Sequence, residues 1–364
     1  MLDFIIAPVL TFIGLFMTLN TSALLLWVER KGSALVQNRI GANRANIFGG
    51  LLPFNVGLIN TLVADLMKFV TKEDFTPPGA DKLLHTLSPF VALLPLLIIF
   101  VVIPFGDVLI IGERTINLQA ANLNVGLLYI LAMVSLSVYG VVLGGWASNN
   151  RWALLGSIRA SAQMISYEIA MGLSLIGVVL TYGTLDLQAI ARAQGELIGG
   201  IIPAWGIFLQ PVSFLIFLVA GIAESKRIPF DLPEAESELI AGYFTEYSGS
   251  KQMVFMLVDF VEIVIVAALV TTLFFGGWQV PFLTREGFVF PWGGGIGLPS
   301  FVVALLQMGA FTGKVFFFGW LQIMIRWTLP RFRYDQLIAL GWKILLPIAL
   351  VNIMVTAFII LLLQ

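Results

Sequence analysis

Long runs of apolar residues, separated by shorter polar stretches, dominate the sequence. Eight of these runs are long enough to cross a bilayer, which takes about 20 residues in a helix. They lie near residues 4–28, 84–111, 123–146, 156–181, 198–223, 253–278, 299–325 and 337–363. The runs lack the alternation of barrel strands, and lipid tolerates only helices and closed barrels. The pattern therefore predicts an all-α polytopic membrane protein with about eight transmembrane helices in one domain, residues 1–364.

The first run carries no basic leader and no small-residue cleavage site, so we expect a retained helix rather than a signal peptide. A long polar stretch, residues 29–83, follows it. Within this stretch Asp65, Lys68 and Lys72 fall on one side of a helix and Leu62, Leu66, Phe69 and Val70 on another. This pattern predicts an amphipathic helix in the membrane interface. A simple surface anchor would show the same pattern.

Composition agrees with the membrane assignment, because 59% of the residues are hydrophobic and the mean hydropathy is +0.97. The chain has no cysteine, which excludes disulfides, thiolate metal sites and cysteine-bound iron–sulfur clusters within it. Its one histidine, His85, precedes an apolar run, where a hydrogen-bonded interfacial role is more common than metal binding. No phosphate-binding glycine motif follows a strand. We expect no metal site and no nucleic-acid partner.

Basic residues gather in one set of alternate loops. These loops hold fifteen of the twenty lysines and arginines: Arg30, Lys31, Arg39, Arg44, Lys68, Lys72, Lys82, Arg151, Arg159, Lys226, Arg227, Lys251, Arg326, Arg331 and Arg333. The opposite loops hold only Arg114, Arg192 and Arg285. The positive-inside rule then places the basic loops in the cytoplasm and both termini outside.

Carboxylates inside the apolar runs are the strongest indication of function. Glu168 lies in the middle of the fourth run, where a charge costs about 2.5–3.5 kcal/mol even on the lenient insertion scale. Asp259 and Glu262, in the sixth run, share one helix face, and so close a pair favours holding one proton between them. Lys314 is a candidate counter-charge, whereas Arg159 faces a different side of its helix from Glu168. Buried structural ion pairs would explain one such residue, but the acids outnumber the bases, which favours a proton path.

The stretch after the fifth run, residues 223–252, is an acidic cytoplasmic loop, and we name it the acidic loop. Its first 16 positions hold five of the 21 acidic residues: Glu224, Asp231, Glu234, Glu236 and Glu238. Lys226 and Arg227 offset part of this charge, and Phe230 between two prolines predicts a rigid, partly buried turn. A charge run is usually a solvated face. At the edge of a bilayer, such a concentration indicates an ion or proton path.

Five segments together resemble the H-subunit family of proton-pumping NADH–quinone oxidoreductase, the membrane subunits of respiratory complex I that adjoin its hydrophilic arm. They are WVERK at 27–31 with QNRIG at 37–41, ADLMK at 64–68 with TKED at 71–74, RASAQMISYE at 159–168, the acidic loop through Glu246-Tyr247, and PRFRYDQL at 330–337. The segments run in order along nearly the whole chain. Two departures stand out. Asp259 occupies a position where the family typically has glutamate. Residues 42–47 lack the expected prolines, and the chain suggests a short insertion near residues 51–57.

The resemblance, together with the charge pattern described above, implies roles for individual residues. A quinone entrance would include Glu29, Arg30, Arg39, Asp65, Lys68 and Phe230. A proton path would include Glu168, Glu224, Asp231, Glu234, Glu236, Glu238, Asp259 and Glu262, with Arg159, Arg227 and Lys314 as charge partners. It further implies that quinone is the substrate and that this chain binds no cofactor, because iron–sulfur clusters and FMN belong to partner subunits. The partners would be the quinone-module subunits of the hydrophilic arm and the other membrane-arm subunits, in the inner membrane of a bacterium.

Two alternatives stay open at this point. One is the matching membrane subunit of an energy-converting hydrogenase or of another donor:quinone oxidoreductase. The full quinone-type entrance around Asp65 and Asp335 argues against it. The other is a standalone proton-coupled transporter, and such proteins usually contain internal repeats with broken helices, which this sequence does not clearly show. Copurification with iron–sulfur subunits would separate the two classes.

Overall fold

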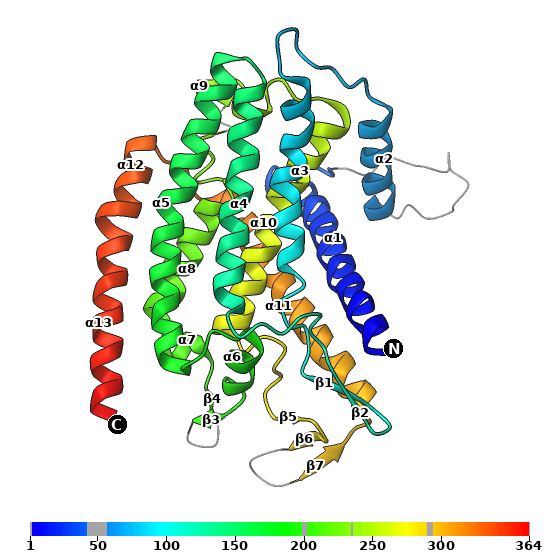
Figure 1. Ribbon diagram of the computed structural model, residues 1–364, viewed down its shortest axis with the longest axis vertical. Coiled ribbons are helices and arrows are strands. Elements are labelled where there is room, and N and C mark those ends of the chain that lie inside the picture. The colour runs from blue at the N-terminus through cyan, green and yellow to red at the C-terminus, as the bar shows by residue number, and fades with distance from the viewer. Residues whose placement is uncertain (1, 42–56, 199–201, 234–235, 290–293, 364) are drawn as a thin grey trace.

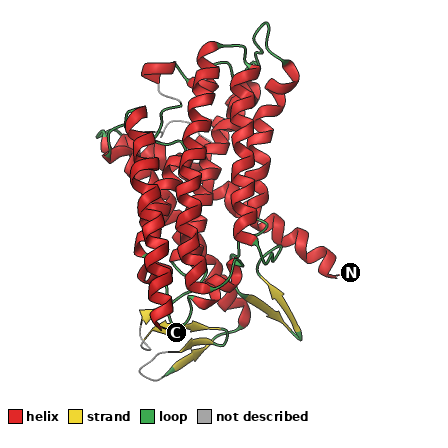
Figure 2. Ribbon diagram, turned by 60° about the vertical axis from the view of Figure 1, so that its left-hand side comes forward, coloured by secondary structure: helices red, strands yellow, loops and turns green. Residues whose placement is uncertain are grey.

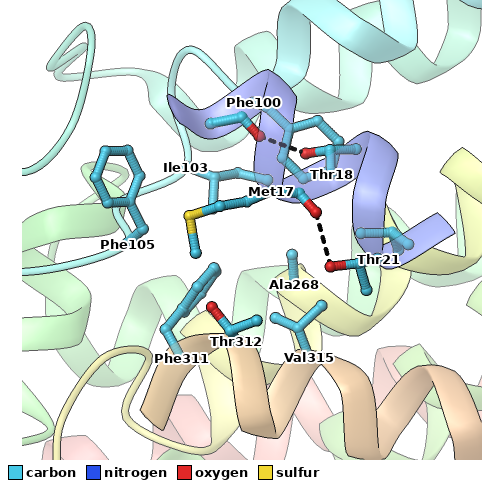
Figure 3. A pocket seen from close by; sticks show the side chains of 12 residues that line it. Met17, Thr18, Thr21, Phe100, Ile103, Phe105, Ala268, Phe311, Thr312 and Val315 are labelled. Atoms are coloured by element: carbon cyan, nitrogen blue, oxygen red, sulfur yellow. Dashed lines mark hydrogen bonds between the residues drawn. The ribbon is translucent and has the colours of Figure 1, made fainter. Parts of the chain in front are cut away.

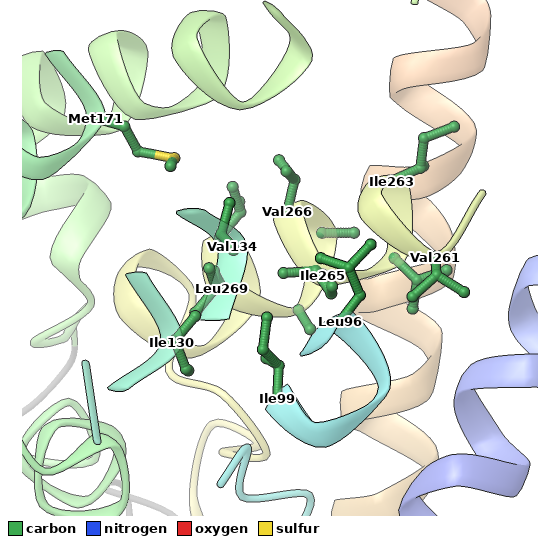
Figure 4. Packing of buried hydrophobic residues seen from close by; sticks show 14 of the residues in the cluster. Leu96, Ile99, Ile130, Val134, Met171, Val261, Ile263, Ile265, Val266 and Leu269 are labelled. Atoms are coloured by element: carbon green, nitrogen blue, oxygen red, sulfur yellow. The ribbon is translucent and has the colours of Figure 1, made fainter. Parts of the chain in front are cut away.

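Helix α10 (Gly249–Phe274) forms the centre of a helical bundle in the computed structural model, which describes residues 2–41, 57–198, 202–233, 236–289 and 294–363. Apart from a few charged side chains the helix is strongly apolar, as expected of a buried helix, and every residue from Val258 to Phe274 is buried. Figure 4 shows its branched side chains among other buried residues of the same hydrophobic cluster, such as Leu96, Ile99 and Ile130. The bundle is therefore built around the helix that carries Asp259 and Glu262.

Within the described residues, seven helices are long and apolar enough to span a membrane. They are α1 (Leu2–Val36), α3 (Lys82–Ile99), α4 (Gly126–Ala147), α5 (Arg151–Tyr182), α10, α11 (Ser300–Thr328) and the continuous helix of α12 (Tyr334–Ala339), the π-helix η2 (Leu340–Leu345) and α13 (Leu346–Leu363). The predicted all-α polytopic membrane fold is confirmed. The run at 198–223 instead contains β3 (Leu197–Ile198), β4 (Ile202–Pro203), the short α7 (Gly206–Leu209) and α8 (Pro211–Glu224), a 14-residue apolar helix.

The two ends of the bundle differ in structure. Both termini and the β-hairpins lie at the lower end in Figure 1, while α9 (Glu236–Leu239) and the first turns of α3 and α5 lie at the upper end. Figure 2 shows the long helices side by side, with the first turns of α1 projecting away from the bundle. We refer to the lower end in Figure 1 as the hairpin end and to the upper end as the acidic-loop end.

Short strands and helices complete the hairpin end. The strands are β1 (Val108–Ile111) with β2 (Arg114–Asn117), β3 with β4, and β5 (Leu283–Thr284) with β6 (Gly287–Val289) and β7 (Gly295–Gly297), all antiparallel. Helix α6 (Leu187–Ala193) precedes β3, and Asp186 caps its first turn by accepting from the N–H of Gln188. Asp107 joins these parts, because its carboxylate accepts from Arg192 at 2.8 Å and from Arg285 at 2.7 Å.

Helix α2 (Gly57–Thr71) contains most of the residues that predict the amphipathic helix, from Leu62 to Val70. It packs against α1 and α10 near the acidic-loop end, and Leu66, Met67 and Val70 stay exposed. Helix α1 continues seven residues beyond Glu29, so Glu29 and Arg30 lie on a helix and not in a loop. This extension places Arg30 against Asp65 of α2, and Glu29 against Arg326 of α11. Of the atypical stretch 42–57, residues 42–56 lie outside the described residues, and Gly57 is the first residue of α2.

Candidate functional site

A cavity of about 170 Å³ lies between α1, α2 and α10. Its lining is apolar apart from Ser22 and the pair of Arg30 and Asp65, whose ion pair joins α1 to α2. The apolar wall includes Leu26, Leu62, Leu66, Phe69, Met253, Met256, Leu257 and Phe260. The amphipathic pattern of α2 thus supplies one wall of a cavity, with its single acid aimed at an arginine on the neighbouring helix.

A second cavity, about 340 Å³ in volume, adjoins the first. The two share four lining residues, Leu26, Arg30, Met256 and Phe260. The second is strongly charged, because Glu29, Arg227, Asp259 and Arg326 also line it. Their neighbours are Ala241, Phe244 and Gln252. An apolar cavity therefore leads directly into a charged one.

Glu29 is the central anion of the charged cavity. Its carboxylate pairs with Arg326 of α11 and lies 3.4 Å from Arg227 of the acidic loop. The Arg227 guanidinium also lies over the ring of Phe260, 4.4 Å from its centroid. Three segments distant in the sequence therefore meet at one carboxylate, and their positive charge exceeds its negative charge.

Lys226, the residue before Arg227, points to a different site. Its side chain is fully buried, and its Nζ lies 2.9 Å from Glu262 and 3.7 Å from Asp259 of α10. The backbone at Lys226 is left-handed, with φ of 53°, and this ends α8 and turns the chain sharply. Arg227 thus lies in the charged cavity, while the adjacent Lys226 pairs with the buried carboxylates of α10.

Glu224, at the end of α8, is 2% exposed. Within the described residues neither of its oxygens has a hydrogen-bond partner, although it lies close enough to Glu262 and Glu168 for their charges to interact. Glu168 of α5 is half-buried and accepts a hydrogen bond from Ser135 of α4. An isolated buried carboxylate is costly in the charged form. This row of acids is therefore suited to holding protons.

The acidic loop is tied to the surrounding helices. Gln163 of α5 donates to the carbonyls of Ala223 and Phe230, at 2.8 and 2.9 Å, and so fixes the start of the turn. Phe230 is buried and stacks on Phe332, 5.4 Å between ring centroids. The rigid, partly buried turn expected from the sequence is present here.

Two acids of this loop are paired with arginines. Asp231 accepts from Arg331 at 2.9 Å, and burial raises the pKa of its carboxyl to about 6 although Arg331 and Arg227 oppose the shift. Glu238 accepts from Arg159 at 2.8 Å. Glu234 and the side chain of Glu236 lie outside the described residues.

Several predicted site residues line neither cavity, among them Phe230, Arg39, Lys68 and Lys314. Arg39 is exposed and donates to Gln37, and Lys68 lies over the ring of Phe69. Lys314, expected as a counter-charge for Asp259 and Glu262, instead sits at the far end of α10. There its Nζ donates to the carbonyls of Phe275, Gly277 and Gln279, at 2.7–3.0 Å. The distance along the chain is the reason, since these carbonyls follow Glu262 by 13 to 17 positions.

Sequence reasoning missed Lys226 and Arg326 as site residues. Lys226 had looked like one of two charges that offset the acidic loop, whereas it is the buried partner of the α10 carboxylates. One signal was available, because Lys226 directly follows an apolar run that ends in Glu224. Nothing in the local sequence linked Arg326 to Glu29, 297 positions earlier.

Other hollows lack this chemistry. A cavity of about 30 Å³ between α1, α10 and α11 (Figure 3) is apolar, and the hydroxyls of Thr18 and Thr21 donate to carbonyls of their own helix. A wider hollow of about 480 Å³ lies at the hairpin end against Glu113 and Arg114. Among the described residues, no group of three or more histidines and acids is arranged to hold a metal ion.

Sequence comparisons with known proteins match nearly the whole chain, including the residues of both cavities. A family model described as NADH dehydrogenase matches residues 8–357. The chain is 47% identical to the first NADH-quinone oxidoreductase H subunit of Geobacter metallireducens, across 95% of this chain and 94% of that protein. It is 48% identical to the second such H subunit of Geobacter sulfurreducens, across 94% and 93%. It is also 43% identical to NADH-quinone oxidoreductase subunit 8 of Rhodothermus marinus, across 93% and 92%.

Proposed function

Because the chain belongs to the H-subunit family of NADH-quinone oxidoreductase, we propose that it forms much of the quinone-binding chamber of that complex and couples quinone reduction to proton translocation. The family assignment makes it a membrane subunit of an oxidoreductase complex. The roles of individual residues below are the proposal.

The adjoining cavities carry this proposal. A quinone has a polar head and a long apolar tail, so its site needs an apolar channel that ends among polar groups. The cavity between α1, α2 and α10 provides the apolar part, and the cavity around Glu29, Arg227 and Arg326 provides the polar end. The Arg30–Asp65 pair stands where the two meet. In this proposal the tail lies along α2 and the head reaches toward the arginines.

The step from chemistry to proton movement would run through Arg227 and Lys226. Reduction adds electrons to the quinone head and makes it more negative until protons arrive. That charge would draw Arg227 away from Glu29, 3.4 Å from it, and shift the backbone that also carries Lys226. Lys226 neutralises Glu262 and Asp259, so its displacement would raise the proton affinity of both carboxylates. Glu224 and Glu168 would pass protons along the same row.

The proposal also covers the setting of the protein. Electrons would come from an iron–sulfur cluster of a hydrophilic-arm subunit, fed by FMN elsewhere in the complex, and this chain would hold no cofactor of its own. Membrane-arm subunits would receive the protonation signal. We place the protein in the inner membrane of a bacterium, with the acidic-loop end in the cytoplasm and both termini outside.

The test is inhibitor-sensitive NADH:quinone reduction by the purified complex, with Asp65→Asn beside the parent. Loss of a charge-assisted hydrogen bond is worth about 1.5–3 kcal/mol, so we expect a fall of roughly 10- to 100-fold. Electron transfer from NADH to a water-soluble acceptor should be unchanged, because it bypasses quinone. Asp74→Asn is the matched control, since Asp74 pairs with Lys251 outside both cavities. Full activity in an assembled Asp65→Asn complex would refute the chamber assignment.

A second substitution, Glu224→Gln, addresses the proton path. The amide has the shape of the protonated acid, so the complex should assemble normally. Proton pumping per quinone reduced should fall, measured in proteoliposomes with a pH-sensitive dye. Glu113→Gln at the hairpin end is the control. Normal pumping in Glu224→Gln would exclude a route through this carboxylate.

A further inference from the structure

Lys343 is an exposed cation within the last membrane-spanning helix. It lies in the π-helix η2, and this helix packs on α5 at the edge of the bundle (Figure 1). Charged side chains inside a span normally face the protein interior or a water-filled cavity. An exposed lysine at this position therefore needs an anion from outside the chain.

The other basic residues around this end of the helix are already paired. Arg331 bonds Asp231, Arg333 bonds Asp335, and Arg159 bonds Glu238. Within the described residues, Lys343 has no ion pair or side-chain hydrogen bond. Its neighbour Trp342 is held in place, since the indole N–H donates to Ser166 of α5 at 3.1 Å.

The position of Lys343 along the helix favours a partner in the headgroup layer. It follows Tyr334, the first helical residue, by nine positions, a distance of about 13 Å along the axis. Side chains of a helix lean toward its N-terminus, so the lysine stem runs back toward the acidic-loop end and the membrane surface. Trp342 is half-exposed beside it, and tryptophan is enriched where headgroups begin. A carboxylate deep in a neighbouring helix would need the opposite orientation.

The helix below Lys343 is apolar and open. Leu350, Met354, Phe358 and Leu361 follow at helical spacing on nearly the same face as Lys343, with 46–73% of each residue exposed. A single cation above a continuous apolar stripe matches a molecule with an anionic head and a hydrocarbon tail. We propose that this face binds one anionic phospholipid, with its phosphate on Lys343 and an acyl chain along the stripe.

The experiment is native mass spectrometry of the assembled complex in nanodiscs of phosphatidylcholine mixed with phosphatidylglycerol. We expect Lys343→Gln to retain about one phosphatidylglycerol fewer per complex than the parent, and Lys343→Arg to retain the parent number. Lys82→Gln is the control, because Lys82 is an exposed lysine at the end of another spanning helix. Unchanged retention in Lys343→Gln, or an equal loss in Lys82→Gln, would overturn the proposal.

A second measurement keeps Lys343 and places a photocrosslinking residue at position 354. It is therefore valid even if the Lys343→Gln complex does not assemble. Crosslinks to phospholipid are expected, and they should weaken in membranes that lack anionic lipid. Crosslinks to a neighbouring subunit would show that protein covers this face, and would overturn the lipid assignment.

Discussion

At the scale of single residues, the acidic loop connects two sites through adjacent side chains. Arg227 contacts Glu29 in the charged cavity, and Lys226 contacts Glu262 and Asp259 in the bundle. Consecutive residues can diverge in this way because the chain turns through a left-handed residue at Lys226. A displacement of Arg227 would therefore also shift Lys226.

Lys226→Met tests how much depends on the buried cation. The methionine keeps the volume, but Glu262 and Asp259 lose the cation between them. Removing one member of a buried ion pair typically costs about 3–5 kcal/mol, so the melting temperature of the complex should drop clearly. Lys251→Met is the matched control. Its partner Asp74 has a side chain 42% exposed, so water can solvate this carboxylate when the lysine is lost, and we expect a clearly smaller drop. Equal losses in both variants would contradict the assigned role of Lys226.

Asp231 should make stability depend on pH. Burial raises the pKa of its carboxyl from 3.8 to about 6, so the folded state binds this proton more tightly than the unfolded chain. The contribution of Asp231 to stability is therefore full below about pH 4 and is lost as the pH rises to about 6. Asp231→Asn should remove this part of the dependence. Melting temperatures of parent and variant between pH 4 and pH 7 measure it, and parallel curves would contradict the prediction.

At the scale of elements, close contacts between helices set the geometry of the site. Helices α3 and α4 approach each other closely at Gly140, where an added Cβ would clash with the backbone of Ala92. Helix α10 packs against α3, so this contact supports the helix that carries the carboxylate pair. Lys314 holds the other end of α10 by three hydrogen bonds.

Gly140→Ala should therefore push α3 and α4 apart. Overpacking of this kind costs about 1–3 kcal/mol, measurable as a lower melting temperature of the purified complex. Gly172→Ala is the control, since nothing lies within 4 Å of an added Cβ there and alanine improves helix propensity by up to about 1 kcal/mol. A Gly140→Ala protein as stable as Gly172→Ala would show that the helices can separate without cost.

At the scale of the whole molecule, charge and structure distinguish the two ends. The helix segments that line the two adjoining cavities, and the acidic loop, lie toward one end. Both termini and the hairpins lie at the other (Figure 1). The basic residues outside the helices cluster at the acidic-loop end. This separation is the basis for placing the acidic-loop end in the cytoplasm.

The chain contains no cysteine, so single cysteines can report this orientation directly. In intact cells, a membrane-impermeant maleimide should label Glu113→Cys in the β1–β2 hairpin. Arg151→Cys, at the start of α5, should be labelled only after the membrane is opened. The reverse pattern would invert the topology and move the quinone chamber to the outside.

The membrane class, the positions of most spans, the amphipathic helix and the presence of acids within the bundle could all be predicted from the sequence. These properties follow from hydropathy and helical period, which are local. Glu168, Asp259 and Glu262 could be recognised as intramembrane acids because a charge in an apolar run needs no distant information. The five matching segments were likewise local, and they sufficed to indicate the family.

Which charges meet could be learned only from the folded arrangement of the helices. Lys226, and not Lys314, neutralises the α10 carboxylates, and Arg326 joins Arg227 at Glu29. The span expected at 198–223 is reduced to the 14 residues of α8, and two cavities of opposite character adjoin. Pairing of this kind depends on how each helix is rotated and shifted against its neighbours. That arrangement is set by side-chain packing between segments as far apart in the sequence as Glu29 and Arg326, and local sequence patterns cannot predict it.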